Sequence, residues 1–337
     1  MTSSRWTPAD LPDLSGVTAV VTGANSGLGW HTALELARHG ARVVLACRDA
    51  VRGEEALGQL RVQLPGSAAE LRRLDLSSLE SVREFAAQVR DAHPRLGLLV
   101  NNAGVMATPR RLTADGFELQ LGTNHLGHFA LTGLLLPSLL AAGGDPGGDP
   151  GGDPGGTPGS TVAGGPARVV TVSSAVHRRG RLHRADLMLE QGYTPYKAYG
   201  QSKLANLLFA AELARRAQQA GAPLASLAAH PGYAATNLQG VGPRMAGNAA
   251  MERLYDLGNR IMAQSAARGA WPSLRAAGDP TATSGQYYGP KGLGEMRGHP
   301  GPVDRSAQAQ NLDDAAWLWQ RSVELTGVDY PALDTSG

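Results

Sequence analysis

Short apolar runs alternate with segments of helical periodicity along most of the chain. In the first 101 residues an apolar run of strand length is followed each time by a segment whose apolar residues recur at helical spacing. These segments are residues 17–22, 28–39, 42–46, 51–63, 69–74, 79–92 and 96–101. Such alternation is typical of successive βα units in a parallel sheet.

The second half of the chain continues the same order. We expect a long helix over 113–141, a strand at 167–173, a helix over 197–220 and a strand at 224–229, then a strand at 286–289 and a closing helix over 307–325. The pattern predicts an α/β fold of the Rossmann type. Residues 1–337 would form a single domain, with about seven parallel strands in the order 3-2-1-4-5-6-7 and helices on both faces.

Residues 143–165 interrupt this order with three copies of Gly-Gly-Asp-Pro. The segment has few apolar residues to offset the cost of ordering, so we expect a flexible surface loop. Calcium binding is the alternative, because Asp145, Asp149 and Asp153 recur at a fixed spacing. The segment lacks the additional ligands that calcium loops supply, which favours the plain loop.

Composition narrows the possible classes of protein. The 337 residues are 42% hydrophobic, which is enough for a large core. The net charge of +2, without a block of basic residues, does not indicate nucleic-acid binding. The single cysteine, Cys47, excludes an intrachain disulfide and a cysteine-cluster metal site, so we expect no metal. No signal peptide or membrane span is expected, which favours a cytoplasmic protein, and the abundance of Ala, Gly and Arg indicates a GC-rich bacterial gene.

A glycine-rich turn links the first expected strand to the first expected helix. It reads Thr22-Gly-Ala-Asn-Ser-Gly-Leu-Gly29. Glycines at such a junction let the backbone turn tightly and approach a pyrophosphate at the helix N-terminus. The candidate cofactor residues here are Gly23, Asn25, Ser26, Gly27, Leu28 and Gly29. An ordinary strand-to-helix corner is the alternative.

The end of the second strand indicates which dinucleotide is bound. A carboxylate at this point would bind a ribose 2′-hydroxyl and repel a 2′-phosphate. This chain has Arg48, which could bind the 2′-phosphate and favours NADP(H) over NAD(H). Asp49 complicates the choice, although it could simply cap the following helix.

Tyr199 and Lys203 are four positions apart in the expected helix 197–220. This spacing places both side chains on one face, where an ammonium could lower the pKa of the phenol and make it a proton donor or acceptor. The same spacing is also typical of an ordinary solvated helix face. The pair therefore needs support from the rest of the chain.

Further motifs supply that support. Asp75-Leu-Ser-Ser follows the third strand, Asn101-Asn-Ala-Gly104 the fourth and Ser173-Ser174 the fifth. Together with the glycine turn and the Tyr199/Lys203 pair, they make almost the whole chain resemble the short-chain dehydrogenase/reductase family.

The resemblance implies roles for particular residues. Ser174, Tyr199 and Lys203 would form a catalytic triad, with Asn124 of the Gly122-Thr-Asn-His-Leu-Gly127 segment supporting the lysine through a water. Tyr199 would exchange a proton with the substrate oxygen, and Tyr199 and Lys203 would also contact the cofactor. His125 and His128 are expected to be structural. The remaining implied cofactor residues are Asp75, Leu76, Asn102, Ala103, Gly104, Pro231, Gly232 and Thr236.

Ser174 and Tyr199 are 25 positions apart, and this long spacing, together with Asn-Ser-Gly-Leu-Gly, Ala-Cys-Arg-Asp and Ser-Lys-Leu-Ala-Asn206, looks most like the retinol-dehydrogenase-like branch of the family. That likeness implies a hydrophobic or secondary-metabolite carbonyl or alcohol as substrate. We expect a substrate lid at residues 233–267, whose apolar residues could cover a substrate or pack on the body or on a subunit partner. These apolar residues are Met251, Leu254, Tyr255, Leu257, Ile261 and Met262.

Two other functions stay open. A catalytically silent NADP-binding regulatory protein would keep the fold, although such proteins typically lose a catalytic residue and all four are present here. An enzyme using the same core for dehydration or epimerisation is the other possibility. Family habit also implies a homodimer or homotetramer, in which the long helices carrying Asn124 and Tyr199 pack across a twofold axis.

Overall fold

An eight-stranded sheet runs through the protein. The structure is a computed structural model that describes residues 5–143, 161–233 and 264–334. The sheet order is β3-β2-β1-β4-β5-β6-β7-β8, with β1 to β7 parallel and β8 antiparallel to β7. The strands are β1 Thr18–Thr22, β2 Arg42–Cys47, β3 Ala69–Arg73, β4 Leu98–Asn101, β5 Ala167–Val172, β6 Leu224–Ala229, β7 Tyr287–Pro290 and β8 Pro300–Pro302. The predicted Rossmann-type α/β fold is confirmed, with one more strand at the edge than expected.

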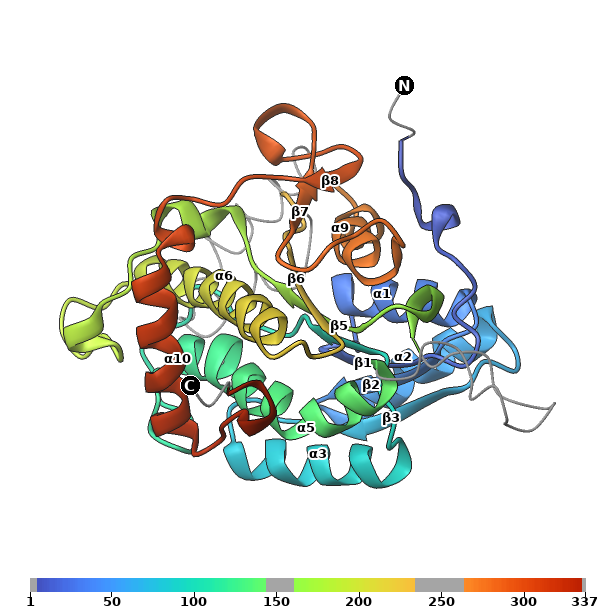
Figure 1. Cartoon of the computed structure of the whole chain (residues 1–337), viewed down its shortest axis with the longest axis horizontal. Helices are drawn as coiled ribbons and strands as arrows, with labels where there is room; N and C mark the ends of the chain where they lie inside the picture. The colour runs from blue at the N-terminus through green and yellow to red at the C-terminus, as the bar shows by residue number, and fades with distance from the viewer. Residues whose placement is uncertain (1–4, 144–160, 234–263, 335–337) are drawn as a thin grey trace.

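Helices cover both faces of the sheet (Figure 1). On one face, α1 (Gly27–Arg38), α2 (Ala50–Gln63) and α9 (Ala266–Gly278) contribute to one hydrophobic cluster. On the other, α3 (Leu79–Ala92), α5 (Gly127–Gly143) and α6 (Pro195–Gln219) contribute to a second. Central strands such as β1 and β4 are therefore buried along their whole length, which explains their continuous apolar runs.

The long helix of the second half begins later than its periodicity suggests. The expected start at residue 113 is wrong, because Gly116 adopts a left-handed φ of 83° and closes a turn onto Thr113. The helical stretch begins with α4 (Leu119–Leu121), passes through a π-helical turn at Gly122–Leu126 and continues as α5. A π turn is a local widening that often marks functional sites, and this one contains Asn124.

This stretch is strongly apolar. By length and composition, Leu119–Gly143 is the one helical stretch among the described residues that could span a membrane. However, 72% of its apolar window is buried inside the protein. Packing against the sheet therefore accounts for its hydrophobic character, as expected of a core helix.

The C-terminal helix α10 (Leu312–Thr326) packs across α6 and α5 (Figure 1). Its Trp319 is buried, stacks on Phe209 of α6 at 5.9 Å between ring centroids and meets Phe129 of α5 at 5.2 Å. Beyond α10, the Tyr330 hydroxyl donates a hydrogen bond of 2.6 Å to the Phe129 carbonyl. The chain's own C-terminal segment thus covers the outer side of these two helices.

Two of the expected segments fall largely outside the described residues. These are most of the Gly-Gly-Asp-Pro insertion at 143–165 and most of the substrate lid at 233–267, including the apolar residues from Met251 to Met262.

Candidate active site

A cavity of about 280 Å³ lies at the carboxyl ends of the first four strands. Parallel strands gather their following loops at this edge, where ligands of open α/β sheets bind. Twelve of the residues expected to bind a cofactor line the cavity: Gly23, Asn25, Ser26, Gly27, Leu28, Gly29, Arg48, Asp75, Leu76, Asn102, Ala103 and Gly104. Segments from four separate βα units therefore meet around one space, as the motifs indicated.

The glycine turn leaves the N-terminus of α1 open toward this cavity. Gly23 has a left-handed φ of 66°, and a Cβ on Gly29 would collide with the Gly23 carbonyl and with the Asn102 amide. The Ser26 side chain, at the N-cap of α1, makes no capping hydrogen bond. By contrast, side chains cap α2, α3 and α6. The first backbone N–H groups of α1 are thus available to an anion, and they fit a pyrophosphate.

Thr22 ties the glycine turn to the loop after β4. Its hydroxyl oxygen accepts hydrogen bonds of 2.9 Å from the backbone N–H groups of both Asn102 and Ala103. The Asn102 side-chain amide donates in return to the Thr22 carbonyl at 2.7 Å. These reciprocal bonds hold two walls of the cavity together.

His128 extends this connection to Asn124. Its Nδ1 lies 3.0 Å from the Asn124 carbonyl, which can only accept, so this nitrogen carries the proton. Burial lowers the pKa of His128 to about 4, and its Nε2, 2.9 Å from the Thr22 hydroxyl, is therefore the acceptor. His125 instead contacts Ser322 of α10 at 2.9 Å. Both contacts agree with the structural role expected of the two histidines.

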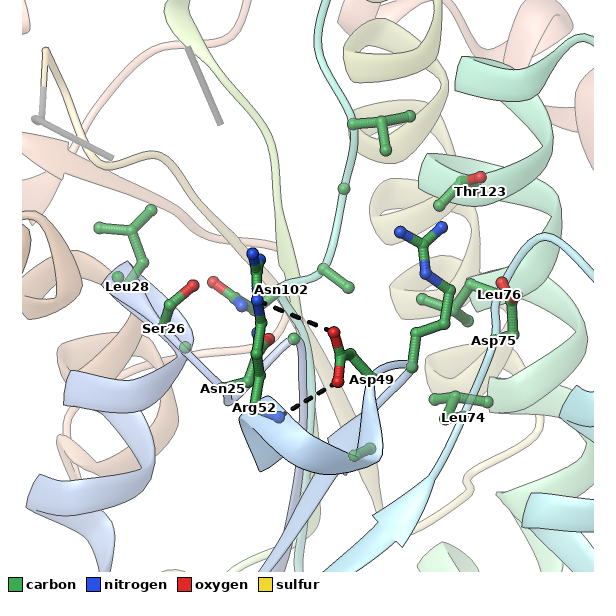
Figure 2. A pocket seen from close by; sticks show the side chains of 18 residues that line it. Asn25, Ser26, Leu28, Asp49, Arg52, Leu74, Asp75, Leu76, Asn102 and Thr123 are labelled. Carbon is green, nitrogen blue, oxygen red and sulfur yellow. Dashed lines mark hydrogen bonds and ion pairs between the residues drawn. The ribbon is translucent and has the colours of Figure 1, made fainter. Parts of the chain in front are cut away.

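Charged side chains surround the end of the cavity near β2 (Figure 2). Asp49 accepts a hydrogen bond of 3.1 Å from the Arg52 backbone N–H and thereby caps α2, as the sequence suggested. The Asp49 carboxylate also lies 3.8 Å from the Arg52 guanidinium. Arg48 is exposed and makes no hydrogen bond or ion pair with any residue in the described ranges. The carboxylate here is engaged by its own helix, while one guanidinium remains unpaired.

Asp75 and Leu76 lie on the wall opposite the glycine turn (Figure 2). Asp75 accepts hydrogen bonds from Ser77, at 2.9 Å from the backbone N–H and 2.6 Å from the hydroxyl. Leu76 packs on the helix start at Gly127, where a Cβ would collide with the Leu76 carbonyl. This wall is therefore rigid and partly apolar, which suits a flat adenine ring.

Ser174, Tyr199 and Lys203 come together beyond the cavity. The Ser174 hydroxyl is hydrogen-bonded to the Tyr199 phenol, and the Lys203 ammonium lies 5.8 Å from the centroid of the Tyr199 ring. The Lys203 Nζ also donates to the Val172 carbonyl of β5 at 3.1 Å. Tyr199 and Lys203 are both buried, so the helix face they share is not a solvated one.

Asn124 and Gly104 connect this group to the cavity. Asn124 Oδ1 accepts a hydrogen bond of 2.7 Å from the Val105 N–H, and its Nδ2 donates to the Val105 carbonyl at 2.9 Å. A Cβ on the cavity residue Gly104 would lie 3.0 Å from Asn124 Oδ1 and 3.5 Å from Lys203 Nζ. A ligand passing Gly104 would therefore meet both side chains.

Burial dominates the ionisation of the pair. It raises the pKa of Tyr199 to about 12, although the hydrogen bond from Ser174 acts in the opposite direction. Burial likewise lowers the pKa of Lys203 to about 8. The expected lowering of the Tyr199 pKa by Lys203 is thus not the outcome in the protein alone, because desolvation of the phenolate outweighs it. The neutral phenol is a proton donor.

The loop after β6 is further along the same edge. Pro231 and Gly232 do not line the cavity described above, and Thr236 lies outside the described residues. The Pro231 carbonyl accepts a hydrogen bond of 2.6 Å from the Gln264 side chain, and the Tyr233 N–H donates to the Met296 carbonyl at 2.9 Å. The C-terminal part of the chain thus holds this turn in place.

Some lining residues were not expected from the sequence. They are Ala46, Asp49, Arg52, Leu74, Val105 and Thr123. Arg52 could have been found, because it stands one helical turn after Arg48. Among the described residues, no group of three His, Cys, Asp or Glu side chains could hold a metal ion.

Known proteins resemble this chain in sequence and structure. Residues 17–148 match the family model described as short chain dehydrogenase. Retinol dehydrogenase 14 of Homo sapiens is 40% identical over 291 residues, covering 82% of this chain and 79% of that protein. Polyprenol dehydrogenase of Mus musculus is 40% identical over 323 residues, covering 95% and 87%. The crystal structure of an uncharacterized protein from Mycobacterium paratuberculosis is 41% identical, with a TM-score of 0.73, and covers 97% of this chain and 100% of its own.

Proposed function

The chain belongs to the short-chain dehydrogenase/reductase family and is an oxidoreductase acting on CH–OH groups, and from this premise we propose its cofactor and substrate class. The cofactor is NADP(H) in preference to NAD(H). The substrate is a hydrophobic carbonyl compound or the corresponding alcohol.

The cavity fits a dinucleotide. The uncapped N-terminus of α1 suits the pyrophosphate, and the wall of Asp75 and Leu76 suits the adenine. Gly104 lies between this cavity and the side chains of Lys203 and Asn124. Because Gly104 has no side chain, it leaves room there for a ligand. When bound, the nicotinamide supplies or accepts the hydride; the chain's own residues bind, orient and transfer the proton.

Tyr199 is the proton donor in reduction. Because burial raises its pKa to about 12, the phenol is protonated at neutral pH and can give its proton to the substrate oxygen. The Ser174 hydroxyl, already hydrogen-bonded to Tyr199, would orient that oxygen. Lys203, within 5.8 Å of the Tyr199 ring, favours the phenolate that forms when the proton leaves. The observation that carries the proposal is this contact of Ser174, Tyr199 and Lys203 beyond the cavity that the glycine turn, Arg48 and Asp75 line.

Arg48 supports the choice of NADP(H). Its guanidinium points to no partner in the described part of the chain, and it lines the cavity beside the end of β2. Asp49, the carboxylate that could select NAD(H), is occupied by Arg52 and the α2 backbone. A 2′-phosphate would find a guanidinium that is unpaired among the described residues, beside a carboxylate that faces Arg52.

The likeness to a retinol dehydrogenase and a polyprenol dehydrogenase supports a hydrophobic substrate. The test is a panel of aliphatic and isoprenoid aldehydes, ketones and alcohols, assayed with NADPH and NADP⁺ by absorbance of the reduced nicotinamide. We expect turnover of the longer apolar members. Cofactor binding without turnover of any member would instead favour the silent regulatory protein.

The rate of reduction should depend on pH through Lys203. Burial places the pKa of Lys203 at about 8, so its ammonium is lost as the pH rises through that value, while Tyr199 keeps its proton until about 12. We expect kcat/KM for carbonyl reduction to be level below about pH 7 and to fall above about pH 8. The measurement is kcat/KM across this range with NADPH saturating at every point. A rate that stays level to about pH 10 would contradict the role given to the ammonium.

A further inference from the structure

Glu295 contacts two segments that flank the candidate active site. It lies in the 291–299 loop between β7 and β8. Its Oε1 accepts a hydrogen bond of 2.9 Å from Arg178, and its Oε2 lies 3.2 Å from Nε2 of His230. Arg178 belongs to the 3-10 turn Ala175–Arg179 that directly follows Ser174, and His230 directly precedes Pro231. One carboxylate therefore joins the serine segment to the loop after β6.

The orientation of the His230 ring is fixed from the turn side. The Gly232 backbone N–H donates to Nδ1 of His230 at 3.2 Å, so Nδ1 is the acceptor, while Nε2 lies 3.2 Å from the Glu295 carboxylate without a hydrogen bond to any described residue. The ring is fully buried and lies against Gly289 of β7, where any Cβ would collide with Nε2. The His230 ring thus lies between the Glu295 carboxylate and the Pro231–Gly232 turn.

The turn that contains Arg178 makes further contacts with the C-terminal part of the chain. Arg178 also donates to the Asp304 carbonyl at 3.0 Å. In the same turn, His177 Nδ1 donates to the Ser174 carbonyl at 2.7 Å, and its Nε2 accepts a hydrogen bond of 3.3 Å from the Ser306 N–H. The segment that bears Ser174 is thus held from the C-terminal side at two neighbouring residues.

The backbone at Glu295 is unusual for a residue with a side chain. Its φ is 55°, in the left-handed region that glycine adopts most easily, and it follows Gly294 at 61°. A carboxylate at such a position is retained against a conformational cost. The contacts with His230 and Arg178 lower the pKa of Glu295 to about 2, so it is charged at any pH at which the enzyme would work.

We infer that Glu295 is a positioning residue that holds the Ser174 segment and the Pro231–Gly232 turn in a fixed relation. This inference rests on the proposed function and on the family resemblance, which makes Pro231 and Gly232 cofactor residues; we place them at the nicotinamide end, because they do not line the cavity that takes the adenosine end. Its effect is therefore confined to that end and does not reach the adenosine end at Arg48.

The first experiment is hydrogen exchange of the protein without any ligand. Glu295→Gln keeps the shape of the side chain and removes its charge. We expect faster exchange both in peptides covering 174–180 and in peptides covering 229–233, including the Gly232 amide. Arg178→Gln removes the other partner of this contact, at an exposed site, and should increase the exchange rate in the same two regions. If the substitution increased the exchange rate only in the 291–299 loop, the inference would be overturned, because the two segments would then be held independently.

The second experiment measures the dissociation constants of NADPH and of adenosine 2′,5′-bisphosphate, which occupies only the adenosine end. In Glu295→Gln the affinity for NADPH should fall about tenfold, the effect of one lost charged hydrogen bond, while the fragment binds as in the parent. Glu324→Gln, which breaks the exposed Arg321–Glu324 ion pair, is the matched control and should change neither.

Each other outcome has a separate meaning. Equal losses for NADPH and the fragment, or no loss for either, would overturn the positioning role while leaving the proposed function intact. A parent protein that binds neither NADPH nor NADH would overturn the proposed function, and the inference with it.

Discussion

Tyr199→Phe should lower the rate of carbonyl reduction by about a hundredfold to ten-thousandfold, the range lost when a general acid is removed. The variant keeps the ring that packs beside Lys203 and loses only the hydroxyl bonded to Ser174. Cofactor affinity should stay within a few-fold of the parent, because the cavity residues are unchanged. The measurements are single-turnover reduction of the best substrate of the panel and fluorescence titration with NADPH.

Tyr196→Phe is the matched control for this variant. It lies on the same helix α6, close to the N-terminus, and its side chain is 48% exposed. Losing its hydroxyl should leave the rate within about twofold, since surface substitutions rarely matter. Reduction by Tyr199→Phe at the parental rate would show that another group delivers the proton.

Arg48→Ala should weaken NADPH far more than NADH. A lost charged hydrogen bond corresponds to about 1.5 to 3 kcal/mol, so we expect the dissociation constant of NADPH to rise by about ten- to a hundredfold. NADH lacks the 2′-phosphate and should bind nearly as it does to the parent. The measurement is a pair of titrations at one fixed ionic strength, because salt screens an exposed guanidinium.

Arg42→Ala provides the comparison for Arg48→Ala. Arg42 is an exposed arginine at the first position of β2, whereas Arg48 directly follows the last, so Arg42 lies away from the cavity. It should alter neither affinity. If Arg48→Ala reduced the affinity for NADPH and NADH equally, Arg48 would bind a part common to both, and the proposed preference would fail.

The parallel strands of the core could be predicted because short stretches of consecutive residues specify most of them. Strands β1, β2 and β4 are short apolar runs ended by a turn, and burial on both faces makes such runs continuous. Strand β6 begins and ends where the pattern placed it, at Leu224 and Ala229. The motifs at the carboxyl ends were then brought together by the sheet topology alone.

Two elements contain residues that usually interrupt structure. A helix was expected directly after the lid but without bounds, and α9 lies there, carries Gly269 and Pro272 and packs on α1. Strand β8, which was not expected, is Pro-Gly-Pro, a composition that argues against a strand except at a sheet edge, where it in fact lies. Sequence propensity could give neither the bounds of α9 nor the existence of β8, because tertiary neighbours decide both.

The sequence indicated which candidate residues would lie near one another but not their electrostatics. The Tyr199/Lys203 spacing correctly indicated that the two side chains meet. The ionisation of Tyr199 depends on burial by surrounding elements, which no pair of positions reveals, and burial reversed the expected direction. Glu295 was missed for a similar reason, since Arg178 and His230 are more than 60 positions away from it.

Helix α10 also limits how two copies of this enzyme could assemble. The family habit would join α5 and α6 to their equivalents in a second chain, but Trp319 and Tyr330 already fill that surface from within. The C-terminal segment of the chain therefore occupies the position that a neighbouring subunit would take. A second copy that approached this side of α5 and α6 would meet α10 and its aromatic contacts first.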